Sequence, residues 1–322
     1  MYQHLTSSST LSQSGAATAI DRLVTACLRS KSPAFHTQTS STGKITVRNS
    51  RLSEYFSNIQ HLLCIYDDKY DYSPSLELFW QVCHDIGLER SASGPVCRES
   101  FTSGYLSHHE SMNFLVRRIR ECAARPCYRR VAADQKRAMK ERVDAFETYI
   151  PRVMEKSPRT TIVRLDLHYL QAVNRITRIE HVYHDLDTLI RRRERHPSFR
   201  YETGYLWCIE QGEDRGFHIH IAFLFDGRYI EDDWKQSLQI GELWLEITRD
   251  KGYFFSCNHQ RHKAKFIKEG RLAVGIFERP YEAEYEKIFF GVGYVIKNDQ
   301  PLLIKPNGRR TYGKGLMPKL QY

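Results

Sequence analysis

The spacing of the apolar residues changes after residue 157, and this change limits the folds open to the chain. Before it, apolar residues recur every three or four positions, as they do from Leu52 to Leu63, which predicts helices. After it, the stretch TTIVRLDLHYL at 160–170 alternates and is rich in β-branched residues, which predicts a strand. The sequence therefore predicts a helical domain over 49–157 and a second domain over 158–322.

The second domain has a defined order of predicted elements. The strand at 160–170 is followed by an amphipathic helix in TRIEHVYHDLDTLIRRRERH, by strands at 205–211 and 217–225, and by a helix at about 231–249. Strands around YFFSCN and RLAVGIF and a helix at about 281–297 complete it. The order strand, helix, strand, strand, helix, strand is that of a ferredoxin-like antiparallel sheet. We expect an α+β fold in which helices cover this sheet and a small helical region precedes it.

The first 48 residues differ in composition from the rest. Residues 1–48 are rich in Ser and Thr and contain one short apolar stretch, AIDRLVTACL, which predicts a mobile arm. They lack the basic start and continuous apolar core of a secretory signal. The run IFFGVGYVI at 288–296 is far shorter than the roughly 20 residues of a membrane span. We therefore expect a cytoplasmic protein without a membrane partner.

Two helix starts carry the residues of a capping box, in which a side chain at each end of the first turn bonds the backbone of the other. Ser107 and Glu110 are spaced in this way in SHHESMNFLVRRIREC. Thr177 and Glu180 are spaced in the same way in TRIEHVYHDL. Both pairs predict that a helix begins just after the first residue of the pair.

Charge and cysteine content narrow the class of protein. The net charge is +10 and the pI is near 9.1, which favours a polyanionic partner. Eight cysteines without a CxxC pair fit neither a disulfide scaffold nor a zinc ribbon. Basic clusters at 191–195, 261–268 and 308–314 are each typical of solvated surface. Together they could contact phosphates, with Tyr312 or Phe266 to stack on bases.

Two histidines share one face of a predicted buried strand. Successive strand side chains point to opposite faces, so His218 and His220 in FHIHIAFLF lie on one side. If the hairpin pairs Glu210 with His218, leaving EDR as its loop, a carboxylate joins the two imidazoles within about 5 Å. These three residues are a candidate site for a divalent ion with positions open for a substrate oxygen. Glu213 or Asp214 could replace Glu210 as the acidic ligand.

A second group of reactive residues follows in GVGYVIKNDQ. Tyr294 and Lys297 are three residues apart and would lie on one face of a helix. A phenol with a pKa of about 10 needs a nearby cation to act as a nucleophile at neutral pH, and Lys297 and the metal could supply it. Tyr285 and Tyr281 on the same predicted helix are the alternative nucleophiles.

Simpler interpretations apply to several of these residues. An HxH pair on a strand is more often solvated or hydrogen-bonded than bound to metal, and Lys297 could simply favour a helix end. Asp166 and His168 lie on one face of the first predicted strand and could border the site, but a structural role is equally compatible with their positions. The zinc-hydrolase motif HExxH is absent.

Glu210, HIH at 218–220 and YVIK at 294–297, in this order, resemble the motifs of HUH endonucleases. Within this superfamily, three segments are most similar to replication initiators of filamentous phages and prophages, the inovirus gene II protein-like group. These segments are EQGEDRGFHIHIAF, YVIKND and the tail GRRTYGKGLMP. The resemblance covers about residues 158–322 and says nothing about residues 1–157.

The resemblance implies a function as well as a fold. It implies that Tyr294 attacks a DNA phosphodiester, leaving a 5′-phosphotyrosine and a free 3′-hydroxyl that primes rolling-circle replication. Glu210, His218 and His220 would bind Mg²⁺ or Mn²⁺, and no nucleotide cofactor is needed. The implied partners are a single-stranded or supercoiled replication origin, with host helicase and polymerase as candidates, in the cytoplasm of a bacterial host. Asn298 stands where some relatives have a second tyrosine, which implies a single-tyrosine enzyme.

Two alternatives remain open at this point. The chain could be a noncatalytic prophage protein that keeps the fold for DNA binding or regulation. The same nicking chemistry could instead serve transposition or plasmid mobilisation. Every motif residue is present, which favours the enzyme over the noncatalytic protein.

Overall fold

The computed structural model describes residues 11–98, 104–212, 215–279, 282–293 and 302–317. The chain divides into two compact units, Met1–Gln135 and Lys136–Tyr322, and each is described by itself below.

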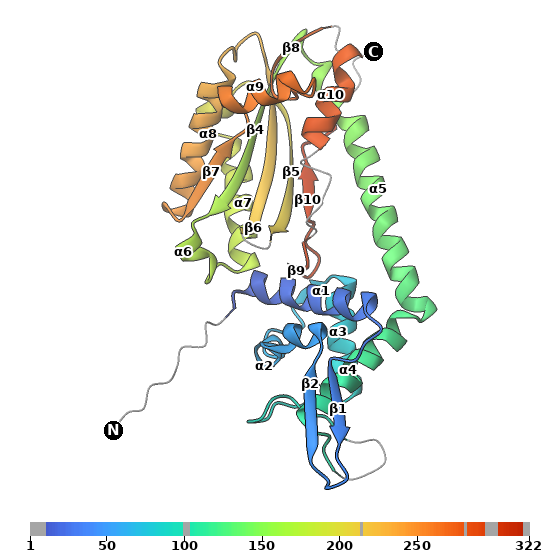
Figure 1. Cartoon of the computed structure of the whole chain (residues 1–322). Helices are drawn as coiled ribbons and strands as arrows, with labels where there is room; N and C mark the ends of the chain where they lie inside the picture. Colours follow the sequence, from blue (N-terminus) through green and yellow to red (C-terminus); the bar gives the residue numbers. More distant parts are fainter. Residues whose placement is uncertain (1–10, 99–103, 213–214, 280–281, 294–301, 318–322) are drawn as a thin grey trace, which may run out of the picture. The chain divides into compact units, whose positions relative to one another are not determined.

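The first unit is mainly helical, as the sequence predicts for most of it (Figure 1). Helices α1, α3 and α4 pack against one another and share a core. Its elements are, in chain order, α1 (Gln13–Arg29), β1 (Phe35–Thr39), β2 (Ile45–Asn49), the 3₁₀ helix η1 (Arg51–Phe56), α2 (Ile59–Leu62), β3 (Tyr70–Tyr72), α3 (Pro74–Asp85), α4 (His108–Ala123) and the start of α5 (Pro126–Met154).

The prediction of a mobile arm over 1–48 is wrong for the part that the structure describes. Ser12 caps α1 by accepting a hydrogen bond from the Gly15 backbone, and the apolar side of α1 is buried against α3 and α4. Strands β1 and β2 then form an antiparallel hairpin. The Ser and Thr content misled the prediction because these residues cap helices and form turns as well as occurring in mobile segments.

The second unit is built on an antiparallel sheet. Its elements after α5 are β4 (Arg159–Tyr169), α6 (Gln171–Asn174), α7 (Ile179–Arg193), η2 (Pro197–Phe199), β5 (Glu202–Gly212), β6 (Gly216–Asp226), α8 (Asp233–Thr248), β7 (Gly252–Ser256), α9 (Gln260–Lys268), β8 (Gly275–Glu278), α10 (Glu282–Gly293), β9 (Ile304–Pro306) and β10 (Tyr312–Lys314).

The strand order confirms the α+β, ferredoxin-like prediction. The strands lie in the order β10-β5-β6-β4-β7, and β8 also pairs with β4. Taking β4, β5, β6 and β7 as the four strands, with α7 and α8 between them, the first strand lies between the third and the fourth and is antiparallel to both. This arrangement places β6 beside both β4 and β5, so the HIH segment occupies the middle of the sheet.

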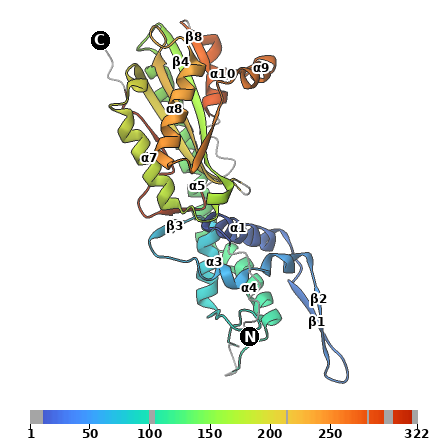
Figure 2. The ribbon, with the colours of Figure 1, turned by 90° about the vertical axis from the view of Figure 1, so that its left-hand side faces the viewer.

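Helices cover the two faces of the sheet unequally. Helices α7 and α8 lie behind the sheet in Figure 1, whereas α9 and α10 lie in front, and the turned view of Figure 2 separates the two layers in the same way. On the front face a core forms between α5, α10 and the upper half of the sheet. Ala222 and Leu224 of β6 belong to that core, so the front face is also the face of His218 and His220.

The boundary between the units lies earlier than the sequence predicts. The units divide after Gln135, inside α5, rather than after residue 157. The second half of α5 packs Phe146, Tyr149 and Ile150 against strands of the sheet. A helical pattern predicts an apolar stripe but not the core that buries it, so α5 could not be assigned to the sheet domain from its sequence.

The two predicted capping boxes have different outcomes. Ser107 and Glu110 form the box at the start of α4. The Thr177 hydroxyl instead donates to the Val173 carbonyl at the end of α6, and α7 begins after Arg178. The short helix α6 has too few apolar residues to show a helical pattern in the sequence. The Thr177 side chain bonds the end of this helix and therefore does not cap α7.

Two further expectations concern the whole chain. The eight cysteines are free thiols, in agreement with the absence of a disulfide scaffold. None of the helices in the described ranges combines the length and the apolar character that crossing a bilayer requires.

Candidate metal centre

The β5–β6 hairpin brings Glu210 and His218 directly opposite each other, as the sequence predicts. The last pair of the ladder is Gly212 with Gly216, so the three residues EDR separate the two strands in the sequence. Gly216 has φ +64°, and a Cβ there would overlap the side chain of Asn174. A glycine is therefore required to close this turn in the register that faces Glu210 toward the histidines.

The ligand atoms of three buried side chains converge on one point. His220 Nε2 lies 3.1 Å and His218 Nε2 lies 3.4 Å from the same oxygen, Glu210 Oε2. The ligand atoms all lie within 4.8 Å of one another, and this is the only such group of three or more in the described ranges. The triad of Glu210, His218 and His220 could therefore hold a metal ion.

The other ring nitrogens of the two histidines have fixed partners. His218 Nδ1–H donates to the Gly216 carbonyl at 3.2 Å, and His220 Nδ1–H donates to Asp166 Oδ1 at 2.6 Å. Both rings are thereby set in the tautomer that leaves Nε2 as the metal-binding atom. Two imidazole lone pairs and a carboxylate oxygen then face each other, an arrangement that needs a proton or a cation between them.

Asp166, whose role its place in the sequence leaves open, lies at the site. It lies opposite His220 across the β4–β6 ladder and also accepts a hydrogen bond from Arg164 Nη2 at 3.2 Å. A carboxylate bonded to the distal nitrogen of a ligand histidine is a common support of metal sites. His168, the other undecided residue, stacks on His218 with ring centroids 5.3 Å apart.

The electrostatics of the centre follow from burial and close pairing. Burial opposes ionisation of Asp166, but the guanidinium of Arg164 and then His220 hold the pKa of its carboxyl well below its usual range. Burial likewise disfavours the charged form of His220, yet Asp166 and Glu210 outweigh burial and raise the pKa of His220 to about 9. Burial, with His218 beside it, lowers the pKa of His168 to about 4. In the metal-free centre, His220 therefore supplies the proton that faces Glu210.

Metal binding at this centre is expected to strengthen as the pH rises. Because the pKa of His220 is about 9, its Nε2 keeps a proton at neutral pH, and a metal ion must displace that proton. The apparent affinity for Mn²⁺, used as the probe ion, should rise about tenfold per pH unit between about pH 6.5 and about pH 8.5. Isothermal titration calorimetry in buffers of different ionisation enthalpy measures both the affinity and the proton release.

A matched control is available on α7. His184 is exposed there, so the His184→Ala variant should keep the same pH slope. An affinity that stays constant over this pH range would contradict the assignment of the displaced proton to His220.

The predicted nucleophile and its lysine lie outside the described residues, as do Tyr281, Glu213 and Asp214. The fallback Tyr285 lies on α10, is half-buried, packs against the front core and stacks on Phe289 with centroids 6.1 Å apart. Tyr294 directly follows Gly293, the last residue of α10. The structure thus carries the chain to the residue before Tyr294 along a helix on the front face of the sheet.

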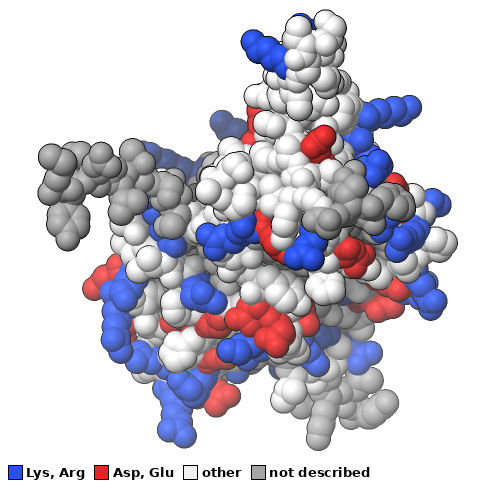
Figure 3. All heavy atoms as spheres, turned by 90° about the horizontal axis from the view of Figure 1, so that it is seen from below, with Lys and Arg blue, Asp and Glu red and all other residues white. Residues whose placement is uncertain are grey.

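The basic clusters differ in how far their charges are paired. In the first and third clusters, Arg193 forms an ion pair with Glu202, and Arg309 forms one with Asp187. Tyr312 packs against the front core rather than standing free to stack on bases. Among the described residues on the face drawn in Figure 3, Lys and Arg are interspersed with Asp and Glu.

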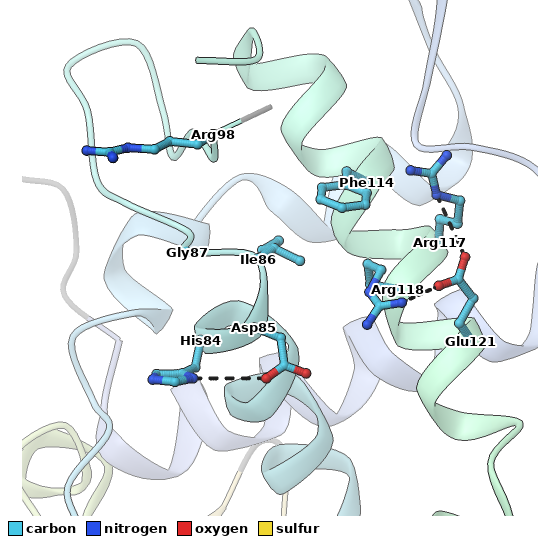
Figure 4. Close-up of a pocket in the computed structure, with 9 residues that line it drawn as sticks. All are labelled: His84, Asp85, Ile86, Gly87, Arg98, Phe114, Arg117, Arg118 and Glu121. Atoms are coloured by element: carbon cyan, nitrogen blue, oxygen red, sulfur yellow. Dashed lines mark hydrogen bonds and ion pairs between the residues drawn. The ribbon is translucent and has the colours of Figure 1, made fainter. Parts of the chain in front are cut away.

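The first unit contains a cavity of about 750 Å³ between the end of α3 and α4 (Figure 4). Its charged groups are largely paired with one another. Arg118 bonds Glu121 at 2.6 Å, Arg117 lies 3.8 Å from the same carboxylate, and His84 lies 4.0 Å from Asp85. Such mutual pairing leaves little charge to recognise a ligand, and we assign no chemistry to this cavity.

The comparisons with known proteins bear on the segment that holds the triad. The family model of the YagK/YfjJ C-terminal domain, which describes a prophage-associated family, matches residues 127–250. The match runs from the start of α5 past the end of α8 and includes Glu210, His218 and His220. No curated protein and no solved structure shows significant similarity to the chain. The part of the chain that carries the candidate metal centre is thus similar to a domain found in prophages.

Proposed function

We propose that the chain nicks one strand of DNA by metal-assisted transesterification and initiates rolling-circle replication of a phage or prophage, as HUH endonucleases do. The observation that carries the proposal is the buried convergence of Glu210, His218 and His220, with Asp166 holding His220 in its metal-binding tautomer. The similarity of residues 127–250 to a prophage-associated domain supports the biological setting.

The proposed reaction exchanges one phosphodiester for another. The Oη atom of Tyr294 attacks the phosphorus, a P–Oη bond forms, and the bond from phosphorus to the 3′ oxygen breaks. The phenol proton is lost as the bond forms, with Lys297 stabilising the phenolate, and the departing 3′ oxygen takes up a proton to become a hydroxyl. No bond energy is lost in this exchange, so no nucleotide cofactor is required.

The chain's own residues prepare the site for this exchange. Glu210, His218 and His220 would hold Mg²⁺ or Mn²⁺, which would polarise the scissile phosphate. Asp166 orients His220, and Arg164 keeps Asp166 ionised. Helix α10 packs Ile288 and Val292 on the same face of the sheet as the triad, which supports an approach of Tyr294 to that face.

The test is the formation of a covalent protein–DNA adduct. The full-length protein is incubated with single-stranded DNA or supercoiled plasmid carrying the sequences that flank its own gene, in Mn²⁺, in Mg²⁺ or in EDTA. On a denaturing gel we expect an adduct with either metal, none in EDTA and none with Tyr294→Phe. The matched control Tyr285→Phe removes one hydroxyl from a residue on α10 and should leave the adduct intact.

Other outcomes would redirect the proposal. An adduct that persists in Tyr294→Phe but is lost in Tyr285→Phe or Tyr281→Phe would move the nucleophile to that residue. Tight binding to the same DNA without any adduct would favour a noncatalytic DNA-binding protein. Adducts formed only at the ends of a mobile element would assign the same chemistry to transposition or mobilisation.

A further inference from the structure

An exposed pair of aromatic side chains lies on the front face at the edge of the sheet. In the β4–β7 ladder, Tyr253 is opposite His168 and Phe255 is opposite Asp166, so both rings point to the face that holds the triad. Tyr253 is 39% and Phe255 is 45% exposed, whereas Phe254 between them packs against α8 on the other face. Two large rings on an edge strand are thus left open to solvent beside the metal centre.

A continuous stack of rings joins this edge to the metal centre. The rings of His218 and His168 are 5.3 Å apart at 22°, and those of His168 and Tyr253 are 4.9 Å apart at 15°. Neighbouring strands are about 4.8 Å apart, so Tyr253 on β7 lies about two strand spacings from His218 on β6. This separation is of the order of one or two nucleotides of an extended strand.

Helix α9 extends the aromatic surface. His262 contacts Phe255 with centroids 5.2 Å apart, and Phe266, one turn further on, contacts His262 at 4.7 Å. Lys263 Nζ bonds the carboxylate of Asp233 at 2.9 Å and thereby ties the helix to the start of α8. The rings of Tyr253, Phe255, His262 and Phe266 are called the aromatic row below.

Unpaired positive charge borders the aromatic row. Arg261, Lys265 and Lys268 of α9 are exposed and form no salt bridge with a residue in the described ranges, and Lys265 Nζ lies 5.8 Å from the ring centroid of Phe266. No residue of α9 is buried, so this helix contributes little to a core. Exposed rings beside uncompensated cations are the combination that binds single-stranded nucleic acid, because bases stack on the rings while phosphates meet the cations.

We propose that the aromatic row binds bases of single-stranded DNA next to the metal centre, with the phosphates along α9. The proposal rests on the proposed function in one respect, namely that the bound strand is the one to be cut. In a duplex the bases stack on one another and are not available to the rings, so the surface should prefer single-stranded DNA. Stacking carries little base preference, so the row positions the strand without reading its sequence.

The test measures binding without cleavage. Fluorescence anisotropy with the full-length protein in EDTA follows a fluorescein-labelled oligothymidine of about 16 nucleotides and the same strand annealed to its complement. Tyr253→Ala and Phe255→Ala should each weaken binding of the single strand by about 5- to 150-fold. Phe255→Trp should retain it, because the ring remains available for stacking.

The matched control is Tyr229→Ala. Tyr229 is also an exposed ring of the second unit, 56% exposed and stacked on Tyr201 with centroids 4.2 Å apart, and its removal should leave the affinity unchanged. Wild-type affinity in both Tyr253→Ala and Phe255→Ala would overturn the proposal, and so would equal affinity of the wild type for the single strand and the duplex.

A second measurement needs no variant. Irradiation of the wild-type protein with an oligonucleotide containing 5-iododeoxyuridine, followed by mass spectrometry, should give cross-linked peptides that contain Tyr253 or Phe255. Cross-links confined to other peptides would overturn the proposal. The two proposals fail separately, because binding in EDTA requires no cleavage. If the aromatic row binds single-stranded DNA but no covalent adduct forms, only the nicking proposal is rejected. If the alanine variants bind single-stranded DNA as the wild type does, only the proposal for the aromatic row is rejected.

Discussion

Replacing His218 with alanine is expected to abolish metal binding and, with it, the metal-dependent adduct. His218 Nε2 is one of three ligand atoms within 4.8 Å of one another, and the remaining pair, His220 and Glu210, cannot surround an ion in the same way. If the ion contributes several kcal/mol to the reaction, its loss should lower the nicking rate by about 1,000-fold or more. Single-turnover nicking and calorimetric Mn²⁺ titration measure the two effects separately.

Two comparison variants make the His218→Ala result specific. Asp166→Asn keeps all three ligands but weakens the partner of His220 Nδ1, and such changes around a ligand typically reduce metal affinity by about 10- to 100-fold. His184→Ala removes an exposed imidazole from α7 and should change neither quantity. Undiminished Mn²⁺ binding in His218→Ala would mean that the ion sits elsewhere, and would remove the basis of the proposed function.

The hairpin that carries the triad was predictable because its register is a local property. A β-hairpin is limited by its loop length, and a short connection between two glycines made the pairing of Glu210 with His218 a natural assumption, which the structure confirms. The fold class followed from the order in which strand-like and helix-like apolar spacing occurs along the chain, since few topologies are compatible with a βαββαβ order. Local patterns therefore sufficed for the sheet and for the convergence of Glu210, His218 and His220, which could hold a metal ion.

Asp166 could not be assigned because its contact is not local. The pairing of β4 with β6 follows from the ferredoxin-like order, but the register that sets Asp166 opposite His220 depends on how far two strands slide past each other. The alternation of side chains along β4 put Asp166 on the face of the triad, but it does not tell which residue of β6 lies opposite Asp166. The spacing puts Arg164 and Asp166 on one face of the same strand, but it does not show that their salt bridge is buried.

Helices were harder to assign to their roles than strands. Helix α9 was visible in the sequence only as the basic cluster at 261–268, because its aromatic residues lie among lysines and its packing partner, Phe255, comes from an edge strand. The second half of α5 carried a clear apolar stripe, yet the stripe is buried against the sheet rather than within the helical unit. Amphipathic spacing indicates that a face is buried and leaves its partner undetermined. The roles of Tyr294 and Lys297 stay predictions, since both residues lie outside the described ranges.

Replacing Arg164 with methionine is expected to destabilise the second unit by about 3–5 kcal/mol, the usual cost of leaving one partner of a buried ion pair without the other. The Arg164 side chain is 10% and that of Asp166 15% exposed, and their charged atoms are 3.2 Å apart. Arg164 is the main group that lowers the pKa of Asp166 against the effect of burial. Without it, an ionised carboxylate is left buried with His220 as its remaining partner.

Urea unfolding followed by tryptophan fluorescence measures this loss, since Trp207, Trp234 and Trp244 all belong to the second unit. Arg164→Met/Asp166→Asn should recover most of the stability, because a neutral amide needs no counter-charge and can still accept the His220 Nδ1–H bond.

The pH dependence gives an independent check. The folded pKa of Asp166 lies below its unfolded value in the wild type, so its contribution to stability is present above about pH 4 and lost as the pH falls. The gap between wild type and Arg164→Met should therefore be widest at neutral pH and narrow in acid. A gap below about 1 kcal/mol at neutral pH would mean that Asp166 reaches water; its bond to His220 would then be a weaker support for the metal centre.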